Sequence, residues 1–302
     1  MERRVLLAYS GDLISSVALA WLLEQGGEVA TVTLDLGQGR DLNDVRDRAL
    51  GIGAARAHVL DVRDVFARDG VAPAWRRPLD EPRAAALARP FIARHAVEIA
   101  RIEGSTAVAH GSAFPADDRS GLEAALREVG LDLPVLAPAR DWSMTPAELL
   151  DFARARGIPA PPSGQAARLE VRTLWGRAVT SPELDAPDVE PPADLFTLTR
   201  SAADWPTEAS IVDVTVTDGM PSALNGVGMS LADLIGSIDV IAGAHGIGRR
   251  DYPAQAGRRP RTIEEAPASV LLHDAFDLMA ANDGTVRATC FRGEVSFEQR
   301  GH

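Results

Sequence analysis

The stretch "RVLLAYSGDLISS", residues 4–16, decides the fold that we expect for this chain. It begins with a short apolar run typical of a buried strand, continues through the tight turn Ser10-Gly11, and then has the spacing of a helix. A strand, a glycine turn and a helix N-terminus together form a common cradle for phosphate. Here, however, Asp12 stands where a phosphate would lie, and the apolar Ile14 follows it.

The alternation of strand and helix continues through the first 140 residues or so. Such repetition predicts a parallel sheet with helices on both faces, because parallel neighbours need crossover connections. Ligands bind such sheets at the carboxyl ends of the strands, where Ser10-Gly11, Asp35-Leu36-Gly37 and His110-Gly111 all fall. The pattern predicts strands at 4–9, 28–37, 55–62, 106–111 and 133–138, and helices at 13–25, 41–53, 86–103 and 118–129.

The chain changes character after this region. Residues 158–207 hold eight prolines, which predicts a linker or extended arm. Beyond it, 210–219 alternates with period two and ends in the hairpin signal Asp218-Gly219, and 285–298 has the pattern of a closing hairpin. We therefore expect an α/β domain with a parallel sheet over 1–157, which the resemblance described below implies to be nucleotide-binding, the linker over 158–207, and a smaller α+β domain over 208–302.

Composition excludes several classes of protein. The net charge of −12 argues against broad binding of nucleic acid or anionic membranes. All 31 basic residues are arginine, which rules out Schiff-base lysines and the lysine of a P-loop. The single cysteine, Cys290, excludes disulfide pairing within the chain and multi-cysteine zinc sites, and we expect no metal site built from side chains. Without a membrane-length apolar run or a signal-peptide pattern, we expect a cytoplasmic protein.

Several stretches, in order along the chain, resemble the argininosuccinate synthase family of N-type ATP pyrophosphatases. The resemblance covers most of the sequence, and this succession of motifs makes it far more specific than one Ser-Gly turn would. The matching stretches are "AYSG" (8–11), "LDLGQG" (34–39), "ALARPFIARHAVEIA" (86–100), "AVAHGS" (107–112), "LPVLAPARDW" (133–142), "LWGR" (174–177) and "AGAHGIGRRD" (242–251).

The resemblance implies an adenine nucleotide α-hydrolase-like (HUP) domain that uses ATP and Mg²⁺. In the family, the ureido oxygen of citrulline attacks the α-phosphorus, pyrophosphate leaves, and the amine of aspartate then displaces AMP. The protein mainly orients the reactants and stabilises charge. The nucleotide-binding residues carried over are Ala8, Tyr9, Ser10, Gly11, Asp12, Ser15, Ser16, Leu34, His110 and Gly111.

The chain departs from the family at the phosphate loop. Asp12 replaces a glycine, Ile14 replaces an aspartate, and Ser15 replaces a threonine conservatively. A non-glycine residue restricts the turn, and a carboxylate there repels phosphate. Asp12 is either a solvated turn residue or a relocated metal contact.

The substrate side departs further. In the second family loop, which this chain writes "HGSAFPADDRSG" (110–121), the aspartate-binding threonine is Ala113, the lysine is Pro115 and the citrulline-binding arginine is Gly121. The other citrulline contacts align with Glu81, Ala178 and Thr180, near Leu169 and Ala254, and with Glu264. Because each lost polar contact to a buried group costs about 1–3 kcal/mol, citrulline is not the substrate that we expect.

Three residues remain as candidate substrate contacts: Arg89, Asp117 and Asp118. The two aspartates fit either a carboxylate pair for acid–base chemistry or the cap of a helix, and His110 fits a functional or a structural role. We can assign no catalytic residue. The family's long oligomerisation segment is missing after "LLHDAFDLMAAN" (271–282), which predicts a homodimer or monomer rather than a tetramer.

Two hypotheses follow. The first is an ATP-dependent ligase that adenylates an amino-acid-like substrate other than citrulline and passes it to an amine. The second is a catalytically inactive homologue that acts as a binding or partner protein.

Overall fold

The computed structural model of the chain describes residues 4–39, 41–111, 121–160, 168–186, 188–255, 260–279 and 283–300. The chain divides into two compact units, the first formed by 1–35, 39–62 and 89–168 and the second by 36–38, 63–88 and 169–302. In the described ranges, no helix is long and apolar enough to cross a membrane.

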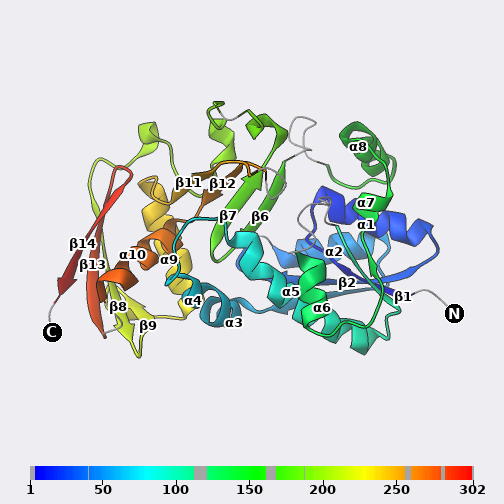
Figure 1. Cartoon of the computed structure of the whole chain (residues 1–302), viewed down its shortest axis with the longest axis horizontal. Helices are drawn as coiled ribbons and strands as arrows, with labels where there is room; N and C mark the ends of the chain where they lie inside the picture. Colours follow the sequence, from blue (N-terminus) through cyan, green and yellow to red (C-terminus); the bar gives the residue numbers. More distant parts are fainter. Residues whose placement is uncertain are drawn as a thin grey trace. The chain divides into compact units, whose positions relative to one another are not determined.

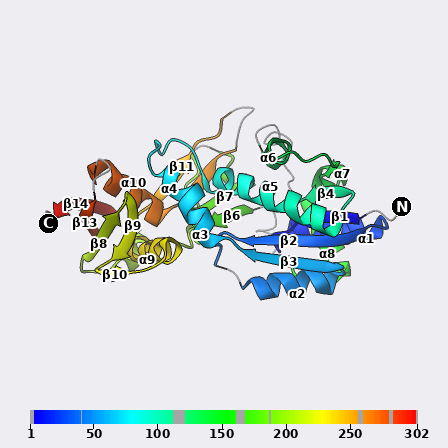
Figure 2. The same cartoon turned by 90° about the horizontal axis from the view of Figure 1, so that it is seen from below.

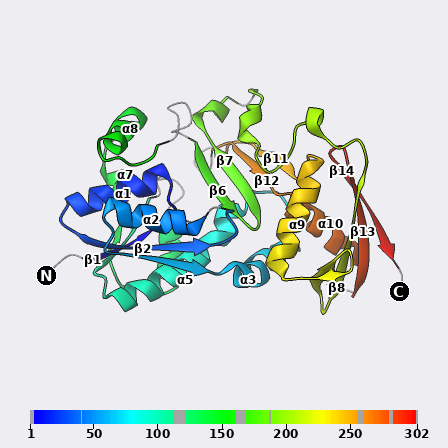
Figure 3. The ribbon, with the colours of Figure 1, turned by 180° about the vertical axis from the view of Figure 1, so that it is seen from behind.

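The first unit confirms the expected parallel sheet. Its five strands lie in the order β3-β2-β1-β4-β5, and each neighbouring pair is parallel. Helices α1, α2, α7 and α8 cover one face and α5 covers the other (Figures 1 and 3). The elements are β1 (Arg4–Ala8), α1 (Leu13–Glu24), β2 (Glu28–Asp35), α2 (Leu42–Ile52), β3 (Arg56–Asp61), α5 (Ala84–Glu103, divided between the units after residue 88), β4 (Ala107–His110), α6 (Leu122–Glu128), β5 (Val135–Leu136), α7 (Pro138–Asp141) and α8 (Pro146–Ala155).

Two apolar clusters hold α1 in place. Leu19 and Leu22 pack toward the sheet with Val5, Leu7 and other side chains of β1, β2, β4 and α2. On another side of the helix, Leu13 and Val17 pack with Leu149, Leu150 and Ala153 of α8. The helix that follows the Ser10-Gly11 turn is therefore buried on two sides, and its N-terminus is fixed at the edge of the sheet.

The second unit contains two antiparallel sheets, of order β10-β9-β8-β13-β14 and β11-β12-β7-β6. The predicted hairpins are confirmed: Asp218-Gly219 joins β8 to β9 and Arg292-Gly293 joins β13 to β14, all four with positive φ. The elements are α3 (Arg63–Phe66), η1 (Ala67–Val71), α4 (Ala72–Ala74), β6 (Leu169–Thr173), β7 (Gly176–Thr180), η4 (Pro182–Leu184), η5 (Ala193–Leu195), η6 (Ala202–Asp204), β8 (Ser210–Thr217), β9 (Met220–Leu224), β10 (Val227–Gly228), α9 (Leu231–Ala244), β11 (Arg249–Tyr252), β12 (Thr262–Glu265), α10 (Pro267–Met279), β13 (Gly284–Phe291) and β14 (Glu294–Arg300).

The structure differs from the linker that we expected over 158–207. Residues 169–180 form the hairpin β6–β7, whose strand β7 pairs with β12 inside the four-stranded sheet (Figures 1 and 3; Figure 2 shows the hairpin from another side). Its two-residue turn is Leu174-Trp175, which is apolar and buried and so carries no turn signal in the sequence. Gly176, with φ +148, is required here because a Cβ would lie 2.4 Å from the carbonyl oxygen of Glu265.

The domain boundaries also differ from the expected 1–157 and 208–302. Residues 63–88 lie early in the chain but belong to the second unit. There the buried Trp75 stacks on Phe276 with ring centroids 5.5 Å apart, and the backbone N–H of Arg83 donates to Glu264 at 2.8 Å. These contacts join segments almost 200 residues apart, which a contiguous reading of the sequence did not suggest.

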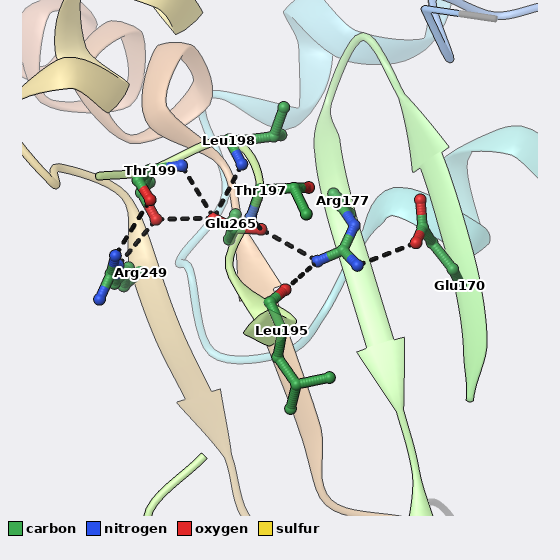
Figure 4. A network of polar contacts seen from close by, with 8 residues as sticks. All are labelled: Glu170, Arg177, Leu195, Thr197, Leu198, Thr199, Arg249 and Glu265. Carbon is green, nitrogen blue, oxygen red and sulfur yellow. Dashed lines mark hydrogen bonds and ion pairs between the residues drawn. The ribbon is translucent and has the colours of Figure 1, made fainter. Parts of the chain in front are cut away.

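A buried carboxylate, Glu265 of β12, organises the segment that leads to η6 (Figure 4). It accepts hydrogen bonds from the backbone N–H groups of Thr197, Leu198 and Thr199 at 2.9–3.0 Å, and from the Thr199 hydroxyl at 2.6 Å. Arg177 of β7 donates to the same carboxylate at 3.0 Å and to Glu170 at 2.8 Å. Three strands, β6, β7 and β12, and the segment 197–199 are thus joined by one charged network.

Candidate functional site

The candidate site lies in the first unit, at the carboxyl ends of β1 and β4. In the order β3-β2-β1-β4-β5, the sheet grows in one direction from β1 to β3 and in the other from β1 to β5. The boundary between β1 and β4 is therefore the switch point of the topology, where doubly wound sheets bind their ligands. Ala8 pairs with His110 across it, so the predicted "YSG" and "HG" turns leave the sheet side by side.

The turn after β1 is held by the strand next to it. The backbone N–H of Tyr9 donates to Val32, and its carbonyl accepts a hydrogen bond from the Thr33 hydroxyl at 2.8 Å. The Tyr9 hydroxyl lies 2.9 Å from the hydroxyl oxygen of Ser16, and burial raises the pKa of the Tyr9 phenol. Tyr9 and Ser16 are both buried, so this pair fixes the turn against the first residues of α1.

Gly11 permits the chain to turn into α1. Its φ of +74 is in the left-handed region, and a Cβ there would lie 2.9 Å from a methyl carbon of Val45 on α2. Ser10 precedes Gly11 and Ser15 follows it, and the hydroxyl of the exposed Ser10 donates to the Ser15 hydroxyl at 3.1 Å. The turn thus presents a backbone without side chain and a pair of hydroxyls at a helix N-terminus, the arrangement that suits an anion.

Asp12 is the N-cap of α1. Its carboxylate accepts a hydrogen bond from the backbone N–H of Ser15 at 2.7 Å, and its carbonyl accepts from Ser16 N–H at 3.0 Å. Aspartate is among the best N-cap residues, and its charge also suits the positive end of the helix dipole. We expected Asp12 to be a turn aspartate or a metal contact. Its carboxylate instead accepts the hydrogen bond of the Ser15 N–H, one of the donors that a bound phosphate would use.

Arg48 of α2 supplies the positive charge at this turn. It is half-buried, and its Nη1 donates to the carbonyl oxygen of Gly11 at 2.6 Å. No sequence signal indicates this contact, because the two residues are 37 positions apart and Arg48 lies in an ordinary helical stretch. Arg48 and Asp12 place opposite charges on the two sides of Gly11.

The turn after β4 closely approaches the start of α1. A Cβ on Gly111 would lie 3.3 Å from the backbone N and Cα of Ser15, so glycine allows this approach. His110 is buried, with 2% of its surface exposed, and its Nε2 lies 3.4 Å from a carboxylate oxygen of Glu123 on α6. The sequence suggested no partner for His110, since Glu123 lies beyond the intervening loop.

Glu123 is in turn paired with Arg140 of α7 and, at 3.6 Å, with Arg127. Burial would raise the pKa of the Glu123 carboxyl, but Arg140 and then His110 hold that pKa below its ordinary value. The His110 ring is therefore oriented by an ionised carboxylate at this edge of the sheet.

The other predicted residues are distributed as follows. Leu34 is buried on β2, two positions past Val32, with which Ala8 is in register. Arg89 is half-buried on α5, the helix on the opposite face of the sheet from α1, and within the described residues no side-chain hydrogen bond or ion pair joins it to the turn (Figures 2 and 3). Asp117 and Asp118 lie outside the described residues.

The described residues of this site fit a phosphate-bearing ligand better than a metal held by side chains. In the part of the chain that the structure describes, no group of three or more His, Cys, Asp or Glu side chains could hold a metal ion. The glycine turn, the hydroxyls and Arg48 are instead donors or positive charges, which suit phosphate oxygens.

Comparison with known proteins agrees with this geometry. A family model described as "Arginosuccinate synthase N-terminal HUP domain" matches residues 4–159, and one described as "Arginosuccinate synthase C-terminal domain" matches residues 171–300. The chain is 40% identical over 279 residues to the argininosuccinate synthase of Rubrobacter xylanophilus, covering 90% of this chain and 68% of that protein. It is 40% identical over 277 residues to the argininosuccinate synthase of Streptococcus thermophilus, covering 90% and 69%.

Proposed function

The chain belongs to the argininosuccinate synthase family, and from that premise we propose that it is an ATP-dependent ligase with an acceptor other than citrulline. In the proposed reaction, an oxygen of an amino-acid-like substrate attacks the α-phosphorus of ATP, a P–O bond forms and pyrophosphate leaves. An amine then attacks the activated carbon, a C–N bond forms, and AMP leaves with the former substrate oxygen.

The observation that carries this proposal is the turn at the switch point of the sheet. Gly11, the hydroxyls of Ser10 and Ser15 and the N-terminus of α1 form a cradle at the carboxyl end of β1. An ATP molecule whose phosphates lie there would have its base near Leu34 and the turn His110-Gly111, as the family resemblance implies. The role of the protein in such a reaction is to orient the reactants and stabilise charge.

Charge at the turn favours a nucleotide that brings its own cation. Asp12 opposes the phosphates and Arg48 attracts them. Mg²⁺, when bound with ATP, neutralises phosphate charge. It commonly keeps several waters and needs only one or two carboxylates besides the phosphates. Asp12 is the carboxylate in this turn, so we propose Mg-ATP, and not free ATP, as the ligand.

The acceptor is proposed to differ because the polar residues that the family uses for citrulline are replaced. Gly121, which aligns with the family's citrulline-binding arginine, is the extended residue before α6 and offers no guanidinium. Ala178, which aligns with a serine, is buried on β7 without a hydroxyl. Loss of several such contacts removes recognition, since each is worth about 1–3 kcal/mol when its partner is buried.

The capping role of Asp12 supports a second candidate function. A carboxylate that already holds the Ser15 N–H acts as an internal anion at the place of a phosphate. Two like charges about 4 Å apart repel by roughly 4 kcal/mol at an effective dielectric constant near 20, about a thousandfold in affinity. If neither Arg48 nor Mg²⁺ offsets this, the chain is an inactive homologue that binds a partner or a nucleotide with fewer phosphates.

The test is calorimetric titration of the purified protein with Mg-ATP, AMP and adenosine, for the wild type and two variants. Asp12→Asn removes the charge but keeps an oxygen for the Ser15 N–H, whereas Asp12→Gly removes both. Because Asp12 is the proposed carboxylate for Mg²⁺, we expect the affinity for Mg-ATP to fall from the wild type to both variants and the affinity for adenosine to stay the same; a rise in Mg-ATP affinity from wild type to Asn to Gly would instead support the second candidate function.

Micromolar binding of Mg-ATP by the wild type, followed by pyrophosphate release with some amino-acid-like acceptor, would support the ligase. Binding of AMP or adenosine without Mg-ATP would support the inactive homologue. Silence with all three ligands in the wild type and in both variants would refute both nucleotide-based functions.

A further inference from the structure

The strand β14 is the longer of the two edge strands of its sheet in the second unit. It is seven residues long and ends the sheet β10-β9-β8-β13-β14, whose other edge, β10, has two residues. Among the residues that the structure describes, β13 is the strand that pairs with it (Figures 1 and 3). Long edges present a row of backbone donors and acceptors to other chains, and proteins blunt them with short strands, proline, bulges or charged side chains. The stretch "EVSFEQR", residues 294–300, contains no proline, and Glu294 and Glu298 restrict the register that a partner strand can take.

The hairpin fixes which backbone groups face the outer side. Arg292 and Gly293 have φ of +47 and +85, as in a two-residue type I′ turn, and Phe291 pairs with Glu294. The pair that closes such a turn is hydrogen-bonded, and the pairs alternate from there. The N–H and C=O groups of Val295, Phe297 and Gln299 therefore point away from β13, toward the outer edge.

This edge is complementary to itself in one register. When a second β14 runs antiparallel with the two-fold axis at Phe297, Val295 lies opposite Gln299, and the outward groups form about six backbone hydrogen bonds. Ser296 then lies opposite Glu298, and neither Glu294 nor Glu298 lies opposite another carboxylate. Moving the axis by one residue opposes Glu294 to Glu298, or Glu298 to its own copy, which is unfavourable.

We propose that β14 is a homodimer interface, in which the β14 strands of two copies pair antiparallel about Phe297 and join two five-stranded sheets into one. The occupant of the edge is a second copy of this chain because the strand matches its own charge pattern and hydrogen-bond register. This interface is isologous, so every favourable or unfavourable contact occurs twice. The inference does not depend on nucleotide binding or on the proposed reaction.

The test measures the monomer–dimer equilibrium of the full chain by sedimentation velocity, from low micromolar to several hundred micromolar protein. Ser296→Arg faces Glu298 of the other copy and should strengthen association about tenfold, whereas Ser296→Glu should weaken it about tenfold. Gln299→Pro removes an outward N–H without touching the β13 ladder and should also weaken association. Ile211→Arg and Ile211→Glu are matched controls, because Ile211 is exposed on β8 in the same row, two strands in from the edge.

Unchanged circular dichroism and thermal unfolding of each variant would show that the fold is intact. Three results would overturn the proposal: a wild type that stays monomeric over the whole range, a dimer that responds equally to the Ile211 controls, or Ser296 variants that shift association in the same direction. The last result would indicate a different register. With the two-fold axis at Ser296, residue 296 of one copy lies opposite residue 296 of the other, so arginine and glutamate there would each face a like charge.

Discussion

Replacing Glu265 by glutamine should be among the most damaging single changes in the second unit. The carboxylate is buried, with 1% of the residue exposed, and five donors point at it. Oε1 accepts from Leu198 N–H, Thr199 N–H and the Thr199 hydroxyl, and Oε2 accepts from Thr197 N–H and Arg177 (Figure 4). Glutamine keeps one acceptor oxygen, but its NH₂ group then faces two donors.

The magnitude follows from the partners that lose their acceptor. A buried backbone N–H without a partner costs about 1–3 kcal/mol. Breaking a buried ion pair on one side costs about 3–5 kcal/mol, although Arg177 keeps the carbonyl of Leu195 and the carboxylate of Glu170. We therefore expect the free energy of unfolding to fall by about 3 kcal/mol or more. Glu170→Gln is the matched control, because it removes the charge of the other carboxylate that Arg177 contacts. The Glu170 side chain is 34% exposed, so this change should cost less than about 1 kcal/mol.

Two measurements check this prediction. Urea unfolding gives the loss of stability, and amide hydrogen exchange of a peptide spanning 196–200 should show that protection of residues 197–199 is lost. Adding Arg177→Met to the Glu265→Gln variant should recover part of the loss, because it removes the uncompensated charge. A Glu265→Gln variant within 1 kcal/mol of the wild type, or a Glu170→Gln variant that is equally destabilised, would refute the reasoning.

Three further predictions concern single residues. Burial raises the pKa of Asp239 from 3.8 to about 7, so the folded state binds an extra proton and stability is lost as pH rises from about 4 through 7. In urea unfolding across pH, Asp239→Asn should flatten this profile and stabilise the protein at pH 8 by up to about 4 kcal/mol. The Nε2 of His245 lies 2.8 Å from the Ser210 hydroxyl oxygen, and burial lowers the pKa of this histidine, so stability is lost as pH falls below 6.5. In thermal unfolding, His245→Gln should lose less stability than the wild type between pH 7 and pH 5. Gly11→Ala places a Cβ 2.9 Å from Val45 at a positive φ, and a loss of about 2 kcal/mol or more is expected; an unchanged urea midpoint would mean that the turn readily rearranges.

The sequence predicted the elements whose signals are local. The strand, turn and helix at 4–16 were correct because apolar runs, a glycine at positive φ and helical spacing act within a few residues. The hairpins at Asp218-Gly219 and Arg292-Gly293 were recognisable because both positions require positive φ. The placement of Ser10-Gly11 and His110-Gly111 at one edge of the sheet followed from the rule that parallel strands end at one edge, whereas the pairing of Ala8 with His110 is known from the structure.

What the sequence could not predict depends on distant partners. Arg48 reaches Gly11 across 37 positions, and Glu123 reaches His110 from beyond a loop. The hairpin β6–β7 was hidden because its turn is Leu174-Trp175, chosen for burial and not for turn conformation. The role of Asp12 as a helix cap was also not foreseen, since one carboxylate in a turn suits solvent, a cation or a backbone N–H equally well.

The interleaving of the two units has a consequence for the order in which the protein can fold during synthesis. Residues 63–88 emerge from the ribosome early, but their partners, such as Phe276 for Trp75 and Glu264 for Arg83, emerge some 180 residues or more later. The second unit can therefore be completed only after residue 276 has emerged, and until then the apolar surface of Trp75 is exposed to chaperones. For the same reason, a fragment cut at residue 157 would retain 63–88 without the partners that bury it.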